Sequence, residues 1–397
     1  MTTDYLLRVL SLFPLFAFVS GASHASSPAG DPVSWRSLKH VQVAVGVTNY
    51  TWDGDSLCLS NGQHHVRFYA GRKKADVDGT VVWLNAPLEG AASNESWRVA
   101  GVDLDFLQLA ILPRAEGKAK PLRILLDPGH GGADDGASSK PPAVKEKDLT
   151  LALAKRIGAH LKKAGLHVDY TRTSDVTLPL GERSYIARKK KADVFISIHA
   201  NHASNADASG VETYVLPPSG FPGTAEGTCT RSWHVGNRND FHNTLLGFSI
   251  HRHLAAISGA TDRGLKRQSF FVLRETACPA VLLEFGFLSN AAEAHRMLCG
   301  DWQEENAAAV VAGIAAYARK AEALDRAVAE KRQQDAEANE RWRRHLAAQA
   351  EKADPPPSAG DVDGPTCDSS PPSKTEPSGT LPKTIFDFYL TNTSQER

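Results

Sequence analysis

The chain has 397 residues, of which 42% are hydrophobic, and its 45 Lys and Arg residues balance its 45 Asp and Glu residues. This length is enough for two or three domains, and the hydrophobic content is typical of globular proteins. Because the formal net charge is zero, no overall field attracts nucleic acid or anionic lipid. The composition therefore argues against a nucleic-acid-binding function.

The first 25 residues are predicted to be a secretory signal peptide. Arg8 precedes a short apolar stretch at residues 9–19, and small residues follow up to Ala25, which is the order of features in a cleaved signal. A membrane anchor is the alternative, but the stretch is shorter than the about 20 residues that span a bilayer, and Pro14 interrupts it. We therefore expect export to the periplasm or cell envelope, with no membrane-spanning segment after cleavage.

The five cysteines are scattered along the chain and include no Cys-x-x-Cys pair. This argues against a thiolate zinc knuckle or a thioredoxin-like motif. Export would permit a disulfide, and Cys278 and Cys299 are the closest candidates in sequence. The odd number leaves at least one thiol unpaired.

Residues 33–113 are predicted to form a small β-rich accessory domain. Turn sequences such as Asn61-Gly62 and Asp78-Gly79 separate its short strand-like segments, and a short helix is expected at residues 103–109. The region contains no catalytic constellation, so we interpret it as a scaffold or docking module, with direct carbohydrate binding as the alternative. The strand-like segments are residues 41–47, 56–59, 65–69, 81–84 and 97–99.

Residues 121–320 alternate strand-like and helix-like segments, which is typical of an α/β fold with a mixed, mostly parallel sheet flanked by helices. The first expected strand, at residues 122–126, is apolar and ends at Asp127-Pro128-Gly129. A helix follows from Glu146 to Gly165, with apolar residues four apart on one face. Further strands are expected at residues 166–171, 194–198 and 280–283, and further helices at residues 180–191, 243–257 and 304–319.

Three candidate site residues stand where the predicted strands end: His130, His199 and Glu284. Glu146 begins the helix that follows the first of these strands. If the strands are parallel, their carboxyl ends share one edge of the sheet, so the four residues can converge. Two imidazoles and one carboxylate are a recurrent catalytic zinc set, and a second carboxylate can take and return a proton.

The loop around His130 is rich in glycine. Gly129, Gly131 and Gly132 remove the neighbouring side chains, which would let a metal ion or a substrate backbone come close. Asp127 is a candidate for orienting His130 or for shaping its loop.

Each candidate also has a simpler interpretation. A glutamate at the start of a helix commonly complements the helix dipole, and a histidine at a strand end is more often a hydrogen-bonded structural residue. Glu284 is the strongest single indicator, because a charged group within VLLEFGF is costly to bury without a partner. The other histidines of the region are interpreted as surface or supporting groups: His202, His242, His251 and His253.

Five sequence blocks follow one another between about residues 123 and 319. They are LLDPGHGGADDGA, KEKDLTLALAKRI, TRTSDVTLPLGERSYIARKKKADVFISIHANHA, GVETYVL and RGLKRQSFFVLRETACPAVLLEFGFLSN. In this order they resemble the zinc-dependent N-acetylmuramoyl-L-alanine amidases of the amidase-3 type, and several blocks in order are far more specific than one motif. The resemblance implies that His130, Glu146 and His199 bind zinc and that Glu284 is the catalytic carboxylate.

The resemblance further implies an enzyme that acts on peptidoglycan, by hydrolysing the amide between N-acetylmuramic acid and L-alanine of the stem peptide. Zinc would polarise the carbonyl and supply the hydroxide, while Glu284 would act as general base and then protonate the leaving amine. A zinc peptidase that cuts within the stem peptide shares this chemistry, and a noncatalytic wall-binding protein is a second alternative. Asn201 and Arg274 are candidates for substrate contact, although capping or salt bridging explains them equally well.

Residues 216–242 form a long Gly/Pro/Thr-rich segment between His199 and Glu284. Loops longer than about 12 to 15 residues are usually functional or disordered. Some similar amidases carry an autoinhibitory helix in this interval that a partner releases, but this segment lacks helical periodicity. We therefore interpret it as a wall of the substrate cleft, and the sequence identifies no protein activator.

Beyond residue 320 the composition changes. Residues 321–354 are rich in Ala, Glu, Arg and Gln without a sustained heptad, which predicts a charged, solvated helical extension rather than a coiled coil. Residues 355–397 are largely Pro- and Ser-rich and are predicted to be a disordered tail.

Overall fold

The computed structural model describes residues 35–37, 39, 41–42, 46, 49–90, 97–110, 121–140, 142–225, 232–257, 259 and 261–350. The predicted signal peptide and the predicted tail at residues 355–397 lie outside this range. The chain divides into two compact units, Met1–Asp325 and Arg326–Arg397, and the site lies in the first. None of the described helices is both long and apolar enough to cross a membrane.

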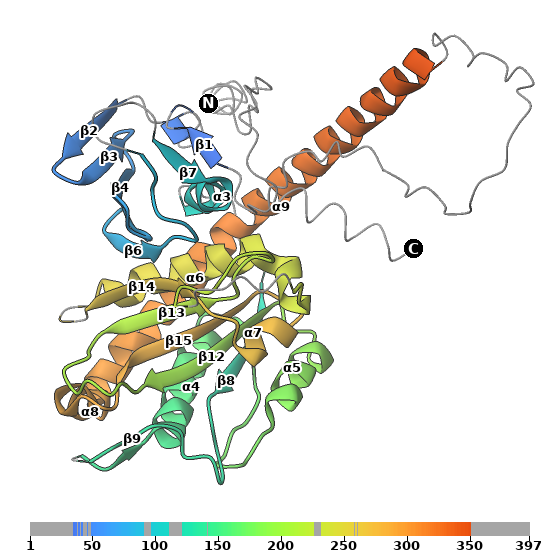
Figure 1. Ribbon diagram of the computed structural model, residues 1–397. Coiled ribbons are helices and arrows are strands. Elements are labelled where there is room, and N and C mark those ends of the chain that lie inside the picture. Colours follow the sequence, from blue (N-terminus) through green and yellow to red (C-terminus); the bar gives the residue numbers. More distant parts are fainter. Residues whose placement is uncertain are drawn as a thin grey trace, which may run out of the picture. The chain divides into compact units, whose positions relative to one another are not determined.

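A mixed sheet runs through the first unit (Figure 1). Its site-bearing strands are β8 (Arg123–Pro128), β11 (His167–Tyr170), β12 (Val194–Asn201), β13 (Val211–Val215), β14 (Asp262–Arg267) and β15 (Ala280–Phe287). Neighbouring strands follow the order β11-β8-β12-β15-β13-β14. The first four are parallel to one another, whereas β13 runs antiparallel to β15 and parallel to β14. The predicted mixed, mostly parallel α/β sheet is confirmed.

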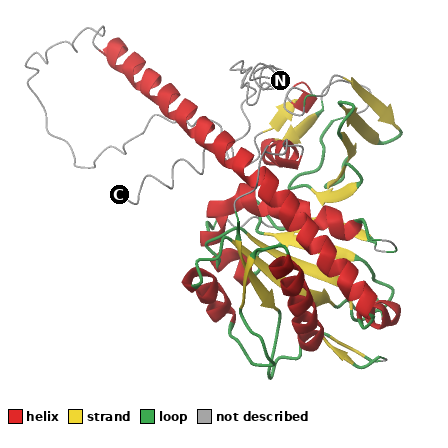
Figure 2. Ribbon diagram, turned by 180° about the vertical axis from the view of Figure 1, so that it is seen from behind, coloured by secondary structure: helices red, strands yellow, loops and turns green. Residues whose placement is uncertain are grey.

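Helices cover both faces of this sheet (Figures 1 and 2). On one face lie α4 (Glu146–Lys163) and α6 (Asp240–Ala255); on the other lie α5 (Leu180–Lys189) and α7 (Phe271–Glu275). A Cβ atom added at Gly247 of α6 would meet side chains of β13, β14 and β15, so α6 packs closely on its face. The helices α8 (Ala291–Met297) and α9 (Gly300–Ala350) follow β15. One helix thus covers both the expected segment at 304–319 and most of the segment at 321–354.

The face of the sheet under α5 and α7 is apolar along one part of strands β12 and β15 and polar further along them. Phe195 and Leu282 pack with Ala187 of α5 and Leu273 of α7 in one buried cluster. Because side chains two residues apart on a strand share a face, His199 and Glu284 lie further along this same face. The strands β12 and β15 continue past the ends predicted at residues 198 and 283, because His199 and Glu284 are register partners in the ladder. Both residues therefore lie within strands, not after them.

The N-terminal region continues the same sheet. Its strands β2 (Asn49–Asp53), β3 (Ser56–Ser60), β4 (His65–Tyr69), β5 (Lys74–Val77) and β6 (Thr80–Trp83) are joined antiparallel. Val82 of β6 pairs in parallel with Leu265 of β14. A two-stranded sheet of β1 (Trp35–Ser37) and β7 (Arg98–Ala100) precedes α3 (Gly101–Ala110). The strand expected at residues 41–47 is not found in its described part, where residues 41 and 42 are helical.

Buried polar groups join this region to the rest of the unit. Asp103 of α3 is fully buried and accepts hydrogen bonds from the backbone and side-chain nitrogens of Asn85 and from Ala86 N. Burial raises the pKa of Asp103, while the charge of Arg267 opposes this rise. Arg267, at the end of β14, donates a hydrogen bond to the carbonyl oxygen of Trp83. The hydrogen bond from Arg267 to Trp83 and the charge of Arg267 near Asp103 thus link β14 to the N-terminal region.

Replacing Asp103 with alanine is expected to lower the free energy of unfolding by about 3 kcal/mol, because several buried donors lose their acceptor and Arg267 loses a nearby negative charge. Urea denaturation followed by circular dichroism measures the change. The matched control is Asp55→Ala at an exposed position, for which a change within about 0.5 kcal/mol is expected. Equal effects of the two substitutions would contradict the interpretation.

The described cysteines are free thiols: Cys58, Cys278 and Cys299. Cys278 and Cys299, the closest candidates in sequence for a disulfide, are therefore not paired with each other. Cys278 packs against the cluster under α5 and α7, and burial raises the pKa of its thiol to about 12, whereas Cys299 is exposed. The two thiols thus lie in different places, one against the core and one at the surface, although the residues are near in sequence.

Candidate functional site

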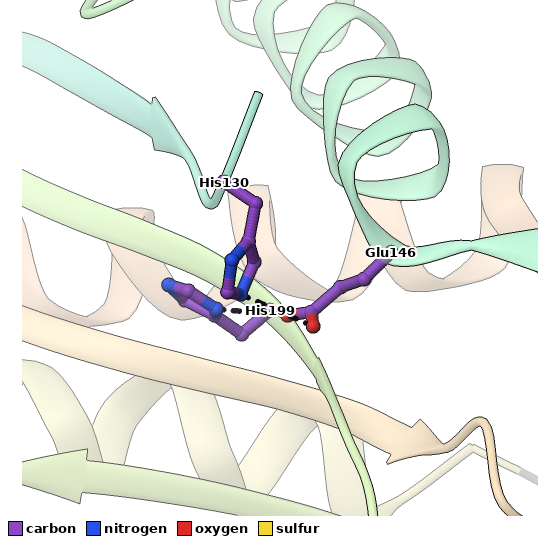
Figure 3. A group of neighbouring side chains, drawn as sticks. All are labelled: His130, Glu146 and His199. Carbon is purple, nitrogen blue, oxygen red and sulfur yellow. Dashed lines mark hydrogen bonds and ion pairs between the residues drawn. The ribbon is translucent and has the colours of Figure 1, made fainter. Parts of the chain in front are cut away.

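His130, Glu146 and His199 come together from three separate elements (Figure 3). They belong to the loop after β8, the first turn of α4 and strand β12, and one potential ligand atom from each lies within 4.8 Å of the others. Glu146 Oε2 is 3.1 Å from His130 Nε2, and Glu146 Oε1 is 2.9 Å from His199 Nδ1. Two imidazoles and one carboxylate at this spacing fit a divalent zinc ion.

Glycines around His130 allow this approach. A Cβ atom at Gly129 would lie 2.3 Å from His199 Cε1, and one at Gly136 would lie 2.6 Å from Glu146 Oε2. His130 itself has a φ of 59°, a conformation that is uncommon for a residue other than glycine. Gly131 and Gly132 instead make room for the carbonyl oxygen of Val176 and for the hydroxyl and backbone of Thr177. Of the three glycines expected to leave space at the site, only Gly129 faces it, and Gly136, which sequence reasoning did not single out, is the second.

Asp127 shapes the loop that carries His130. The Asp127 carboxylate is buried and accepts hydrogen bonds from Thr171 Oγ1, Ser197 Oγ and Arg183 Nη1, at 2.6, 2.8 and 2.7 Å. Arg183 also donates to the carbonyl oxygens of Pro128 and His130. Of the two roles considered for Asp127, these contacts favour shaping the loop over orienting the imidazole.

A second arginine, Arg172, holds the same loop. It donates to the carbonyl oxygens of Pro128 and Gly129 at 3.0 and 2.8 Å. Sequence reasoning missed both Arg172 and Arg183, although both lie in the TRTSDVTLPLGERSY block. A buried aspartate such as Asp127 needs a cationic partner, which is the signal that could have directed attention to them.

Asp134, rather than Asp127, contacts the Nδ1 atom of the His130 imidazole. Asp134 Oδ2 lies 2.8 Å from His130 Nδ1, which leaves Nε2 directed to Glu146. Burial lowers the pKa of His130, but hydrogen bonds to Glu146 and Asp134 outweigh burial, so the pKa is raised. Carboxylates that accept from the second nitrogen of a metal-binding histidine fix its tautomer and ring orientation.

Replacing Asp134 with asparagine is expected to weaken zinc binding by about 10- to 100-fold, because the carboxylate that orients His130 is lost. Competition with a chromophoric chelator measures the dissociation constant. Asp135→Asn is the matched control, since Asp135 pairs with Lys145 and Lys147. If both variants bind zinc as tightly as wild type, Asp134 does not support a metal ligand.

Glu146 is held as a carboxylate. Burial by itself would raise its pKa, but hydrogen bonds with His130 and His199 lower the pKa far below its usual value. Glu146 Oε2 also accepts from Ala137 N at 2.7 Å, and Oε1 accepts from Ala200 N at 3.1 Å. The negative charge is therefore fixed between the two imidazoles.

Glu284 has the opposite environment. It lies between His199 on β12 and Glu212 on β13, and its Oε2 atom is buried without a hydrogen-bond partner among the described residues. Burial raises the pKa of Glu284 well above its usual value, and the charges of Glu146 and Glu212 raise it further. A partly exposed carboxyl group with one buried, unpartnered oxygen beside a potential metal set is a strong candidate for proton transfer.

The two residues proposed for substrate contact differ. Asn201 is engaged within the protein, since its Nδ2 donates to Glu212 Oε2 and its Oδ1 accepts from His202 N. Arg274 lies on α7 with its guanidinium carbon 5.6 Å from the ring centroid of Phe271. Its Nε atom is buried without a hydrogen-bond partner in the described chain. Contact with substrate stays a prediction for both.

The other histidines considered as candidates lie outside the set of His130, Glu146 and His199. His202 is exposed, as expected. His251 is fully buried, so it is not a surface group; its ring nitrogens bond Thr213 Oγ1 and Asp262 Oδ1. His242 bonds the Tyr317 hydroxyl and Asp325.

The segment at residues 216–242 is described only in part. Residues 226–231 lie outside the described range. The last part contains a 3₁₀ helix at Val235–Asn239, and α6 begins at Asp240, three residues earlier than expected. Its role as a cleft wall stays a prediction.

Comparisons with known proteins identify the family of the chain. Residues 124–316 match the Amidase_3 family, described as N-acetylmuramoyl-L-alanine amidase. The chain is 30% identical over 229 residues to the N-acetylmuramoyl-L-alanine amidase AmiC of Escherichia coli O6:H1. The aligned region covers 52% of this chain and 55% of AmiC. It is 33% identical over 224 residues to the protein YqiI of Bacillus subtilis. That aligned region covers 56% of this chain and 97% of YqiI.

Among solved structures, the chain is similar to the catalytic domain of CwlV, an N-acetylmuramoyl-L-alanine amidase from Bacillus (Paenibacillus) polymyxa. The two are 34% identical, with 49% of this chain and 97% of CwlV covered and a TM-score of 0.42. The match thus spans about half of the length of AmiC but nearly all of YqiI. On the family match and this coverage, the chain belongs to the N-acetylmuramoyl-L-alanine amidase family.

Proposed function

We propose that the protein is a zinc-dependent enzyme that hydrolyses the amide between N-acetylmuramic acid and L-alanine of the stem peptide in peptidoglycan. The observation that carries the proposal is the convergence of His130, Glu146 and His199 beside Glu284, whose Oε2 atom is buried without a partner among the described residues. The family supports the choice of bond, since relatives such as AmiC are named for this amidase activity.

His130, Glu146 and His199 would hold the zinc ion. When bound, zinc would supply a Lewis acid for the scissile carbonyl and lower the pKa of a water molecule. Glu284 would take a proton from the attacking water at its Oε2 atom and return it to the leaving nitrogen of L-alanine. The raised pKa of Glu284 suits this role, because a higher pKa makes the carboxylate a stronger base and helps it hold the proton until transfer to the leaving nitrogen.

We further propose that the enzyme acts outside the cytoplasm, in the periplasm or cell envelope. Peptidoglycan, the proposed partner, lies there, and residues 1–25 have the pattern of a cleaved signal peptide.

Mass spectrometry of muropeptides digested with and without a zinc chelator tests the function. We expect glycan free of peptide together with intact stem peptides that begin with L-alanine, no product with chelator, and recovery after zinc is added. A peptidase of the stem peptide would instead release shortened peptides and leave L-alanine on the sugar. A noncatalytic wall-binding protein would release nothing.

A further inference from the structure

A charged cluster beside Glu284 has no part in the chemistry proposed above. At its centre is Glu212 of β13, which is 2% exposed. Glu212 Oε1 accepts from Arg263 Nε at 2.7 Å and from Lys266 Nζ at 2.5 Å. Glu212 Oε2 accepts from Asn201 Nδ2 at 2.9 Å and from the Tyr214 hydroxyl at 2.6 Å. We call these five residues the Glu212 cluster.

Glu212 is a charged support and not a free reactive group. Burial by itself would raise its pKa, but hydrogen bonds from Arg263, Lys266 and Tyr214 lower the pKa below its usual value. Both carboxylate oxygens are already engaged by two donors each. Glu212 therefore holds the groups around it.

The cluster lies on the same edge of the sheet as the metal-binding set. Glu284 is the register partner of His199 on one side and of Glu212 on the other, and Arg263 lies on β14, the strand next to Glu212. Adjacent strands are about 4.8 Å apart. Arg263 is thus two strands, or roughly 10 Å, from Glu284 across the sheet.

Arg263 is held on three sides. Its Nε is fixed by Glu212, its guanidinium carbon lies 4.8 Å from the ring centroid of Phe287, and its carbonyl oxygen accepts from Trp83 Nε1 at 2.9 Å. The Arg263 side chain is nevertheless 36% exposed, and its terminal nitrogens have no partner among the described residues. A guanidinium fixed in this way is preorganised to bind a carboxylate with two parallel hydrogen bonds.

The charge balance of the cluster favours an anion. Arg263 and Lys266 carry two positive charges against the single negative charge of Glu212. Lys266 Nζ also lies 5.8 Å from the ring centroid of Trp83 and 5.9 Å from that of Tyr214. One net positive charge therefore remains at the sheet edge beside the proposed reaction centre.

We propose that Arg263 is a specificity-determining residue that binds a carboxylate of the stem peptide, with Glu212 as its buried positioning residue. This inference rests on the proposed function. An extended peptide advances about 3.3 to 3.6 Å per residue, so a carboxylate on the second or third stem residue is at a suitable distance from the scissile amide. Trp83 brings the N-terminal region into this site, since its indole holds the backbone of Arg263 and a Cβ at Gly264 would lie 2.7 Å from Trp83 Cδ1.

Three matched muropeptides test the inference with zinc-loaded full-length protein. One has free carboxylates, one carries an amide on the second stem residue (D-isoglutamine), and one carries an amide on the side-chain carboxylate of a third-residue diaminopimelate. Arg263→Met is expected to lower kcat/KM about tenfold on the first substrate, mainly through KM. One of the two amidated substrates lacks the carboxylate that Arg263 binds. On that substrate the variant and wild type should have equal kcat/KM. Arg263→Lys should recover part of the loss.

Arg252→Met is the matched control, because Arg252 on α6 is 46% exposed and faces Asp78 of the N-terminal region. It should leave kcat/KM unchanged on all three substrates, and thermal unfolding should show that each variant is folded. An equal loss on all three substrates, or no loss on any, would overturn the inference. Release of free glycan and intact stem peptide by wild type tests the proposed function separately, so the two failures can be told apart.

Discussion

Replacing Glu284 with glutamine is expected to lower kcat by about 10³-fold, because the side chain can no longer take and return a proton. Zinc binding should persist, since the side chains of His130, Glu146 and His199 provide the metal set without Glu284. Steady-state kinetics on muropeptides and metal analysis of the purified variant measure the two quantities. A variant that digests muropeptides at the wild-type rate would exclude Glu284 as the catalytic carboxylate.

The same substitution has a pH-dependent effect on stability. The folded-state pKa of Glu284 is raised above its ordinary value of 4.5, so its contribution to stability is present below that value and is lost as the pH rises toward the folded-state pKa. Glutamine cannot ionise. In the presence of chelator, Glu284→Gln should therefore raise the unfolding temperature at about pH 8 and have a smaller effect at about pH 5. A gain of the same size at both pH values would contradict the raised pKa.

Replacing His199 with alanine is expected to remove both zinc and activity. The substitution leaves only His130 and Glu146 of the three proposed ligands, and loss of the metal should lower kcat/KM by at least about 10³-fold. Metal content after dialysis and kinetics with added zinc measure the effect.

His202→Ala provides the control for this substitution, because His202 is three residues away and exposed. Its zinc content and kcat/KM should equal those of wild type. If His199→Ala retains stoichiometric zinc, His199 does not belong to the metal site.

Sequence patterns determined the α/β class and the set of residues that converge. Apolar strands that end in polar residues indicated that His130, His199 and Glu284 share one edge of a parallel sheet, and the structure brings His130, His199 and Glu146 together. These features are local, because the composition of a strand, its end and the start of the next helix each depend on consecutive residues. The roles of the four residues stay predictions that the experiments above test.

Only the tertiary structure decided which distant groups support them. Asp127 and Arg183 are 56 residues apart in the chain, and Trp83 and Arg263 are 180 apart. Hydrophobic periodicity shows which face of an element is buried, but it does not say which remote donor satisfies a buried carboxylate. The Glu212 cluster and the pairing of β6 with β14 both depend on such remote partners. They follow from how the strands are ordered in the sheet, which no single segment of the sequence specifies.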